Sequence, residues 1–493
     1  MRKEAHLMKR VHGTVRRLAA LLMALSMMLL LAACHRDGDP ITPEKNDTRK
    51  PAGVAEDTDI ILPYSREEGV NPFSGTSLMN EAIMPLLYDG LYSIDEHYEP
   101  SMNLVEDITV NGTTLMLTMN ANRRFSDGTV ISADDVVYSY NMAKNSLYYG
   151  TLLSGISGVT AGGTTTVSFT LEKPNQFIAA NLVFPVVKSG TADQKDDIPV
   201  GSGRYVYEDS DAGGVLKKSE QYKSERFKAE QIFLINIPNE ETLFNSLNIE
   251  TVNAAVDDIS TGELRRVKAQ SAPLPLNNLV YVGIRQNGNL ADAAVRQALS
   301  ALLDRKTLAD SGMSGYAVQS DIPLNPDWFA KGDIKTQSMD YTKARDLLAE
   351  SLRDQPIKVV TLSGNSFKEQ IAKEVQRELV SAGVACEVEA LEPAIYRSAV
   401  KSGLYDLYIG EQRLTNDMDI TSVLDDKQLQ SSWASVMSGT TTCETFMKGF
   451  YKQMPFLTIG FRTGVLAYSR NLKTAVKPLP GSPYDNVTEW QLG

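Results

Sequence analysis

The chain has 493 residues, of which 42% are hydrophobic and 22% charged; this excludes an intrinsically disordered protein and predicts several folded domains. Its 61 acidic residues outnumber the 49 basic ones, so the net charge of −12 disfavours binding to nucleic acid or to an anionic lipid surface. With four histidines and three cysteines, the chain has no possible histidine cluster and no CxxC motif, which removes the common zinc sites.

The first 34 residues have the layout of a signal peptide. Residues 2–17 carry six basic residues and one acidic residue, and the next sixteen residues are uncharged. This apolar run is shorter than the roughly 20 residues that span a bilayer. It ends in Leu31-Ala32-Ala33-Cys34, which resembles the lipobox of bacterial lipoproteins and implies that Cys34 is lipidated after removal of residues 1–33. An ordinary signal peptide with an incidental cysteine, or an uncleaved anchor, is the alternative.

Residues 34–58 contain proline, glycine and charged residues without apolar periodicity, which predicts a flexible tether. The folded part is thus expected outside the cytoplasmic membrane, held to it by lipid. In such an oxidising space Cys386 and Cys443 could pair, although a buried free thiol is an equally good interpretation of Cys386.

The remaining chain alternates short strands and helices, which is typical of α/β lobes. Apolar residues fall on every second position in three segments, and this predicts strands at 58–63, 114–119 and 167–171. Helices with a 3.6-residue period are expected after caps at Ser132, Asp292, Thr342 and Ser366.

No motif for catalysis is present. The chain lacks GxxxxGK[ST], GxGxxG after a strand, GxSxG and HExxH sequences. His97 lies in a polar stretch that predicts a solvated turn. A carboxylate pair could still hydrolyse a glycoside, but the adjacent acids at 134–135 and 425–426 are better explained as helix N-terminal charge and as a solvated loop. Binding without catalysis is therefore the leading class.

Six segments in order resemble one protein family. The stretch RFSDGTVISADDVVYS at 124–139 resembles the signature of the bacterial extracellular solute-binding proteins of family 5, the oligopeptide, dipeptide and nickel receptors of ABC importers. Further matches are Asn71-Pro72, LYDGL at 87–91, PVGSGRY at 199–205, VRQAL at 295–299 with Asp304-Arg305, and YDL at 405–407.

This resemblance implies a two-lobed fold of the periplasmic-binding-protein type II, with an extra subdomain in the first lobe. By analogy, the first lobe comprises 59–77, 198–278 and 457–493, the extra subdomain 78–197, and the second lobe 279–456. Only thirty residues lie between Leu424 and Pro455, so part of the second lobe is expected to be shortened.

The resemblance also implies a function. The expected protein is a lipid-anchored, extracytoplasmic receptor that closes its lobes around a peptide and passes it to ABC permease subunits, without a cofactor or metal. The alternatives are a sugar or metal chelate as ligand, a surface sensor on the same fold, and a secreted carboxylate-dependent hydrolase.

Four residues are candidates for contact with the ligand. Asp419 falls where peptide-binding relatives carry an acid that meets the ligand ammonium, and Arg413 could pair with a ligand carboxylate. Tyr64 follows the first strand, where relatives present backbone to the cleft, and Trp433 lies in the shortened region. The alternatives are a solvated loop acid for Asp419, an exposed loop side chain for Arg413, core packing for Tyr64 and scaffold for Trp433.

Overall fold

The structure, a computed structural model, describes residues 58–210, 213–335 and 338–493. The predicted signal peptide, Cys34 and the predicted tether up to residue 57 lie outside the described residues. No helix in the described part is long and apolar enough to cross a membrane.

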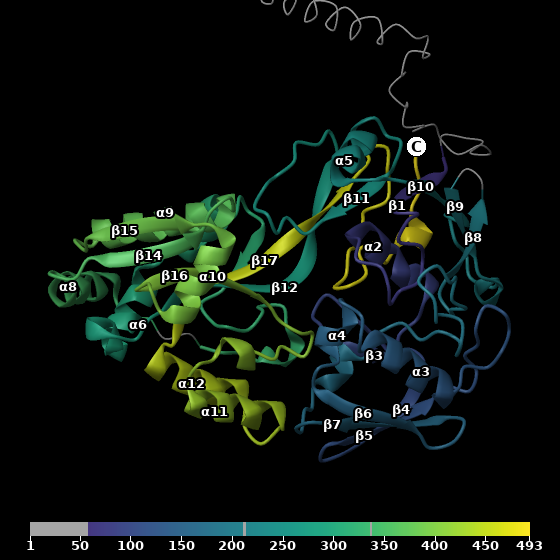
Figure 1. Ribbon diagram of the computed structural model, residues 1–493, viewed down its shortest axis with the longest axis horizontal. Helices are drawn as coiled ribbons and strands as arrows, with labels where there is room; N and C mark the ends of the chain where they lie inside the picture. Colours follow the sequence, from purple (N-terminus) through teal and green to yellow (C-terminus); the bar gives the residue numbers. More distant parts are fainter. Residues whose placement is uncertain (1–57, 211–212, 336–337) are drawn as a thin grey trace, which may run out of the picture. The chain divides into compact units, whose positions relative to one another are not determined.

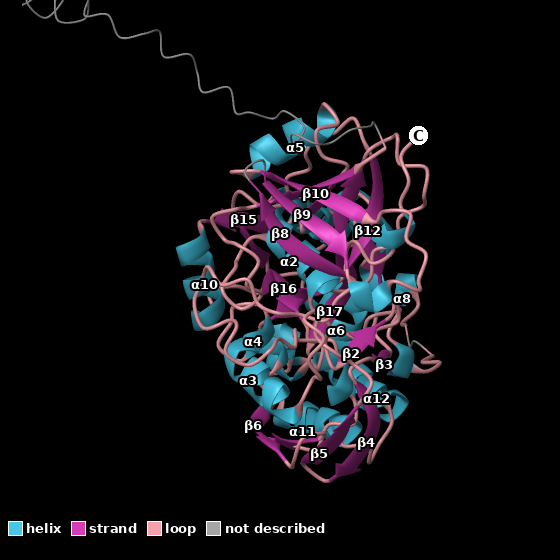
Figure 2. Cartoon of the chain, turned by 90° about the vertical axis from the view of Figure 1, so that its right-hand side faces the viewer, coloured by secondary structure: helices cyan, strands magenta, loops and turns pink. Residues whose placement is uncertain are grey.

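The first sheet has four strands in the order β1-β10-β9-β8 (Figures 1 and 2). The strands are β1 (Ile60–Tyr64), β8 (Tyr205–Ser210), β9 (Gly213–Lys218) and β10 (Gln231–Asn236). β1 pairs with β10 in parallel, and every residue of β1 is buried. The strand predicted at 58–63 is therefore present as β1, and all of its side chains are buried because a parallel strand is covered on both faces.

A second, antiparallel sheet lies within residues 78–197, where the extra subdomain is predicted, and has the order β4-β5-β7-β6. Its strands are β4 (Val105–Asn111), β5 (Thr114–Met119), β6 (Ile156–Ala161) and β7 (Thr166–Leu171), and helix α3 (Ala133–Ala143) packs against it (Figure 1). In β5 and β7 buried residues alternate with more exposed ones, which confirms the predicted period of two. The same part of the chain contains α2 (Leu78–Leu87), β2 (Tyr92–Ile94), β3 (Pro100–Met102) and α4 (Tyr149–Leu152).

The segment at 199–205 fixes the end of α2. An added Cβ at Gly201 would lie 2.3 Å from the carbonyl oxygen of Leu87, and one at Gly203 would lie 2.4 Å from the carbonyl carbon of the same residue. Only glycine allows this approach of two backbones. The orientation of α2 therefore depends on these two glycines.

The predicted capping box at the start of α3 is confirmed. One carboxylate oxygen of Asp135 accepts hydrogen bonds from the backbone nitrogen and the hydroxyl of Ser132, at 2.8 and 2.6 Å. The other accepts from the backbone nitrogen of Ser189 at 2.8 Å, which joins the helix to the following loop.

We expect Asp135→Ala to lower the free energy of unfolding by about 1–3 kcal/mol, because three hydrogen bonds to a buried carboxylate are lost. Asp134→Ala removes an exposed acid from the same helix end and is the matched control, with an expected loss below about 1 kcal/mol. Urea unfolding followed by circular dichroism measures both; equal losses would contradict the cap as the source of stability.

The third sheet is the largest, in the order β11-β17-β12-β16-β14-β15, with β13 also paired to β17. Its strands are β11 (Ala254–Asp257), β12 (Gln270–Ile284), β13 (Ala317–Gln319), β14 (Ile357–Leu362), β15 (Cys386–Leu391), β16 (Leu407–Arg413) and β17 (Phe456–Tyr468). The helices of this half are α5 (Glu240–Asn248), α6 (Ala293–Leu302), α7 (Arg305–Thr307), α8 (Tyr341–Ser351), α9 (Ser366–Ser381), α10 (Pro393–Ser402), α11 (Lys427–Met437) and α12 (Cys443–Gln453).

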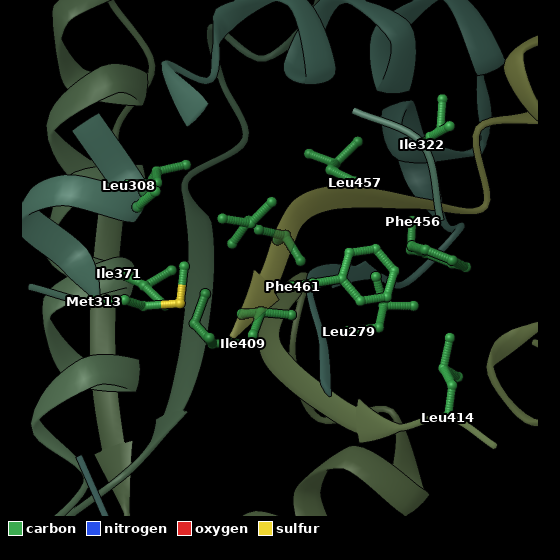
Figure 3. Close-up of a cluster of buried hydrophobic side chains, with 14 of the residues drawn as sticks. Leu279, Leu308, Met313, Ile322, Ile371, Ile409, Leu414, Phe456, Leu457 and Phe461 are labelled. Atoms are coloured by element: carbon green, nitrogen blue, oxygen red, sulfur yellow. The ribbon is translucent and has the colours of Figure 1, made fainter. Parts of the chain in front are cut away.

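Two hydrophobic cores divide the described residues. One lies among the first sheet, α2, α3 and the antiparallel sheet, which we call the first lobe. The other lies mainly among β14–β16 and the helices α6, α8, α9, α11 and α12, which we call the second lobe. Figure 3 shows part of the second core, where Leu279 and Phe461 are partners on neighbouring strands beside Ile409. The predicted domain boundaries stay predictions.

Strands β12 and β17 are long and antiparallel, and they run between the two lobes (Figure 1). Their register shifts between Leu274 and Asn278, where β12 carries Pro275. Proline cannot donate to a ladder, and a bulge bends a strand locally. The ladder is therefore interrupted at this point of the connection between the lobes.

Several predicted helix starts need correction. The cap of α9 is Asn365, whose side chain accepts from the backbone nitrogen of Lys368, rather than Ser366. Asp340 caps α8 in the same way in place of Thr342, whereas the cap predicted at Asp292 is confirmed. Asp426 was predicted in a solvated loop but caps α11. In each corrected case the side chain of Asn or Asp binds the free backbone N–H groups of the first turn.

Candidate functional site

A cavity of about 1090 Å³ lies between the lobes. The first lobe contributes α2, β2, the segment around α4 and the loop 479–485, and the second lobe contributes the end of β16 with the residues that follow it. Segments as far apart in the sequence as Thr76 and Asp485 therefore form one site. This volume is slightly above the usual upper limit for small-molecule binding sites.

Arg413, predicted to contact ligand, lies on the wall of this cavity at the end of β16. Its guanidinium carbon is 5.3 Å from the centroid of the Tyr148 ring, a cation–π arrangement that holds the side chain across the lobe boundary. No carboxylate of the described residues forms a salt bridge with it. The guanidinium group is therefore available to an anionic group of a ligand.

Glu81 lies on the same cavity and was missed from the sequence. It is half-buried on α2, where it is the only charged residue among ten. Its pKa is raised to about 7, mainly by burial. The negative charges of Glu68 and Asp258 add to this rise, and the positive charge of Arg413 opposes it. A lone charge in an otherwise apolar helix was the signal that could have found it.

The charged side chains on the cavity wall are mostly acidic. Three of the acids have a cationic partner: Asp89 pairs with Arg123, Glu240 with Arg265, and Asp485 with Arg204. The acids without a cationic partner in the described part are Glu81, Asp95, Asp257 and Asp258. Tyrosine rings fill much of the remaining wall, namely Tyr88, Tyr92, Tyr98, Tyr148, Tyr149 and Tyr222.

Asp419 and Trp433, both predicted to contact ligand, lie together in the second lobe and do not line the cavity. The indole nitrogen of Trp433 donates to the Asp419 carboxylate at 3.1 Å, and Thr421 donates to the same oxygen through its backbone nitrogen and its hydroxyl. Trp433 is fully buried, with its ring 5.0 Å from that of Phe446. This geometry describes scaffold, and a binding role for either residue stays a prediction.

Tyr64 is fully buried at the end of β1 and does not line the cavity. Its ring centroid lies 6.4 Å from that of Tyr207 on β8 of the same sheet. The packing interpretation fits this position, while contact with ligand stays a prediction.

The lobes also touch through a loop of the extra subdomain. The side-chain amide of Asn175 donates to buried Asp417 at 2.7 Å, and the backbone and side chain of Gln176 donate to the carbonyls of Met437 and Val436 at 2.8 Å each. Phe177 packs edge-on against Trp328 at 5.0 Å. Helix α11, in the region that is predicted to be shortened, thus meets the first lobe directly.

The remaining candidates for chemistry have structural surroundings. His97 is exposed in a turn, as predicted, and its Nδ1 lies 3.2 Å from the carbonyl oxygen of Asp327. Cys386 and Cys443 are free thiols, and burial raises their pKa values to about 12 and about 11. In the described ranges no group of three or more His, Cys, Asp and Glu side chains is arranged to hold a metal ion.

Residues 98–426 match the family model of the bacterial extracellular solute-binding proteins, family 5. The chain belongs to this family. The resemblance of the six sequence segments is thereby confirmed, and the site described above is the interlobe site of a family 5 solute-binding protein.

Known proteins agree with this assignment. The family 5 protein is 25% identical over 422 residues to the oligopeptide-binding protein AppA of Bacillus subtilis, covering 76% of this chain and 77% of AppA. It has the fold of the ABC transporter substrate-binding protein CtaP of Listeria monocytogenes, with a TM-score of 0.67, 19% identity, and coverage of 88% and 99% of the two chains. NikZ of Campylobacter jejuni, solved with Ni(L-His), gives a TM-score of 0.58 at 19% identity, with coverage of 88% and 99%.

The fold is thus the predicted mixed α/β, two-lobed architecture of periplasmic binding proteins, and the family indicates a solute-binding role in ABC transport outside the cytoplasm. The relatives of this family 5 protein bind solutes and are not enzymes.

Proposed function

We propose that this family 5 protein captures a short peptide between its lobes and delivers it, unchanged, to the permease of an ABC transporter. The observation that carries the proposal is the interlobe cavity, in which Glu81 of the first lobe and Arg413 of the second present opposite charges. A peptide carries an ammonium group and a carboxylate, so its two ends complement these walls. The oligopeptide-binding relative AppA supports the same ligand class.

Closure of the lobes is the transport signal in this proposal. A ligand that contacts both lobes favours the closed state through its higher affinity for that state. Shifting the lobes from 1:99 to 99:1 requires about 5.5 kcal/mol of such preference. The bulged crossing of β12 and β17 provides a place for this movement.

The membrane anchor is part of the proposal. Cys34 at the end of the signal peptide would carry the lipid, and the tether to residue 58 would hold the lobes near the permease on the outer side of the membrane. The acidic net charge of the chain gives the lobes no electrostatic attraction of their own to anionic lipids.

The full-length protein extracted from membranes is expected to carry short peptides that native mass spectrometry detects. The amount of peptide that co-purifies with the Arg413→Gln variant should be at least about tenfold lower, because a charge-assisted hydrogen bond to the ligand is lost. Arg397→Gln removes an exposed arginine elsewhere in the second lobe and is the matched control. Recovery of only sugars, or of a nickel complex such as the one bound by NikZ, would replace the peptide by that solute; conversion of a bound solute would instead indicate a hydrolase.

A further inference from the structure

Glu81 is positioned by its helix to face the cavity. Its neighbours Ala82, Ile83, Leu86 and Leu87 are buried in the first core, so α2 cannot turn to place Glu81 in solvent. In the described part of the chain no hydrogen bond acts on its carboxylate, and no cation forms a salt bridge with it. A half-buried carboxylate without a partner is unfavourable, and a ligand cation would relieve this cost.

The surroundings of Glu81 do not supply that cation. Arg413, the one positive group that acts on it, belongs to the opposite lobe and lies over the Tyr148 ring. The carboxylate of Glu68 is occupied by hydrogen bonds from Thr76 and Ser77, and Asp258 adds a second negative charge. The first-lobe side of the cavity is therefore negative around Glu81.

We propose that Glu81 is a specificity-determining residue that pairs with an ammonium group of the bound peptide, so that the cavity selects amine-bearing peptides over acidic ones. This inference rests on the proposed peptide-binding function. The ammonium group can come from the peptide N-terminus or from a lysine side chain, which share the same chemistry.

A pH dependence follows from the position of Glu81. Its carboxyl group has a pKa of about 7, because burial, Glu68 and Asp258 together raise the pKa more than Arg413 lowers it. Tyr148 and Tyr149 are the other titratable groups beside it. A ligand ammonium pairs only with the ionised form, so protons compete with the ligand at acidic pH. Affinity for the selected peptides should fall as the pH drops below 7, by up to about tenfold per pH unit.

The test measures binding of peptide libraries to the full-length protein in detergent, by isothermal titration calorimetry at pH 6 and pH 8. Three libraries of two- to five-residue peptides are used, one with a fixed lysine, one with a fixed glutamine and one with a fixed glutamate. Each library is prepared both with a free and with an acetylated N-terminus. Glu81→Gln is the variant, and Glu81→Asp restores the charge. Glu106→Gln, exposed on β4 and away from the cavity, is the matched control for net charge.

The wild-type protein should prefer at least one amine-bearing library over the acetylated glutamate library. Glu81→Gln should weaken that binding by about ten- to a hundredfold and remove its pH dependence. Glu81→Asp should keep part of the affinity and part of the pH dependence, and Glu106→Gln should have the affinity and pH dependence of the wild-type protein. If acetylation abolishes binding, the group that pairs with Glu81 is the N-terminal ammonium. If the lysine library is preferred, that group is the lysine side chain.

Two results would overturn the inference while leaving the proposed function intact. One is peptide binding without preference for an amine. The other is equal weakening of every library by Glu81→Gln, which would assign Glu81 to a partner within the protein such as Arg413. Failure of the wild-type protein to bind any library would overturn the proposed function, and this inference with it.

Discussion

Replacing Glu411 by alanine is expected to lower the free energy of unfolding by about 3–5 kcal/mol, because it leaves the buried Arg462 without its counter-charge. Arg462 is only 3% exposed, and its Nε donates to the Glu411 carboxylate at 2.7 Å. The same carboxylate accepts from the Asn278 side chain at 2.8 Å and pairs with Lys368 at 3.4 Å. The network joins β12, β16 and β17 where the lobes meet.

Glu387→Ala is the matched control, since it removes an exposed glutamate from β15 in the same lobe and should change stability by less than about 0.5 kcal/mol. Urea unfolding monitored by fluorescence measures both variants. Equal stability of Glu411→Ala and the wild-type protein would show that Arg462 finds another partner.

The network also gives stability a dependence on pH. Burial alone would raise the pKa of Glu411, but Arg462, Lys368 and Asn278 lower it below its ordinary value of 4.5. A depressed carboxyl pKa contributes stability above pH 4.5, and this contribution is lost as the pH falls through the folded-state pKa. The difference in stability between the wild-type protein and Glu411→Ala should therefore shrink below pH 4.5.

Trp433→Ala is the second large effect, with an expected loss of about 3–5 kcal/mol from the cavity left in the second core. The ring is fully buried and packs against Phe446 at 5.0 Å and Trp328 at 6.4 Å. Trp433→Phe keeps most of this packing but removes the donor to Asp419, so it should lose about 1–2 kcal/mol. Leu404→Ala, at a residue that is 62% exposed, is the control.

Trp433→Phe also separates scaffold from ligand binding. Thermal unfolding and calorimetric titration with the preferred peptide library are measured on the same sample. A scaffold residue shifts the midpoint of unfolding and leaves peptide affinity close to that of the wild-type protein. A weaker affinity at unchanged stability would restore the prediction that Trp433 contacts ligand.

Local interactions were predictable from the sequence. The capping box of Ser132 and Asp135 involves residues three positions apart, and the alternation in β5 depends on neighbours along one strand. The cap of α9 was displaced by one residue because Asn365 and Ser366 both have side chains that suit a helix start, and only the backbone conformation decides between them.

The site was less predictable because its parts are remote in sequence. Arg413 was chosen because its guanidinium group can pair with a ligand carboxylate, and it does line the cavity. Asp419 was chosen from the family pattern, but its carboxylate bonds to Trp433, fourteen residues later on another element. Glu81 was missed because an apolar helix such as α2 indicates core, and only the tertiary structure shows which turn of it borders the cavity.

The burial of the two free thiols, partial for Cys386 and complete for Cys443, has a consequence for their reactivity. Thiol–disulfide exchange requires a thiolate, and burial keeps Cys386 and Cys443 protonated at physiological pH. Once the protein is folded, neither thiol is expected to react readily with alkylating reagents or oxidants. This low reactivity is compatible with the proposal that lipid is attached at Cys34.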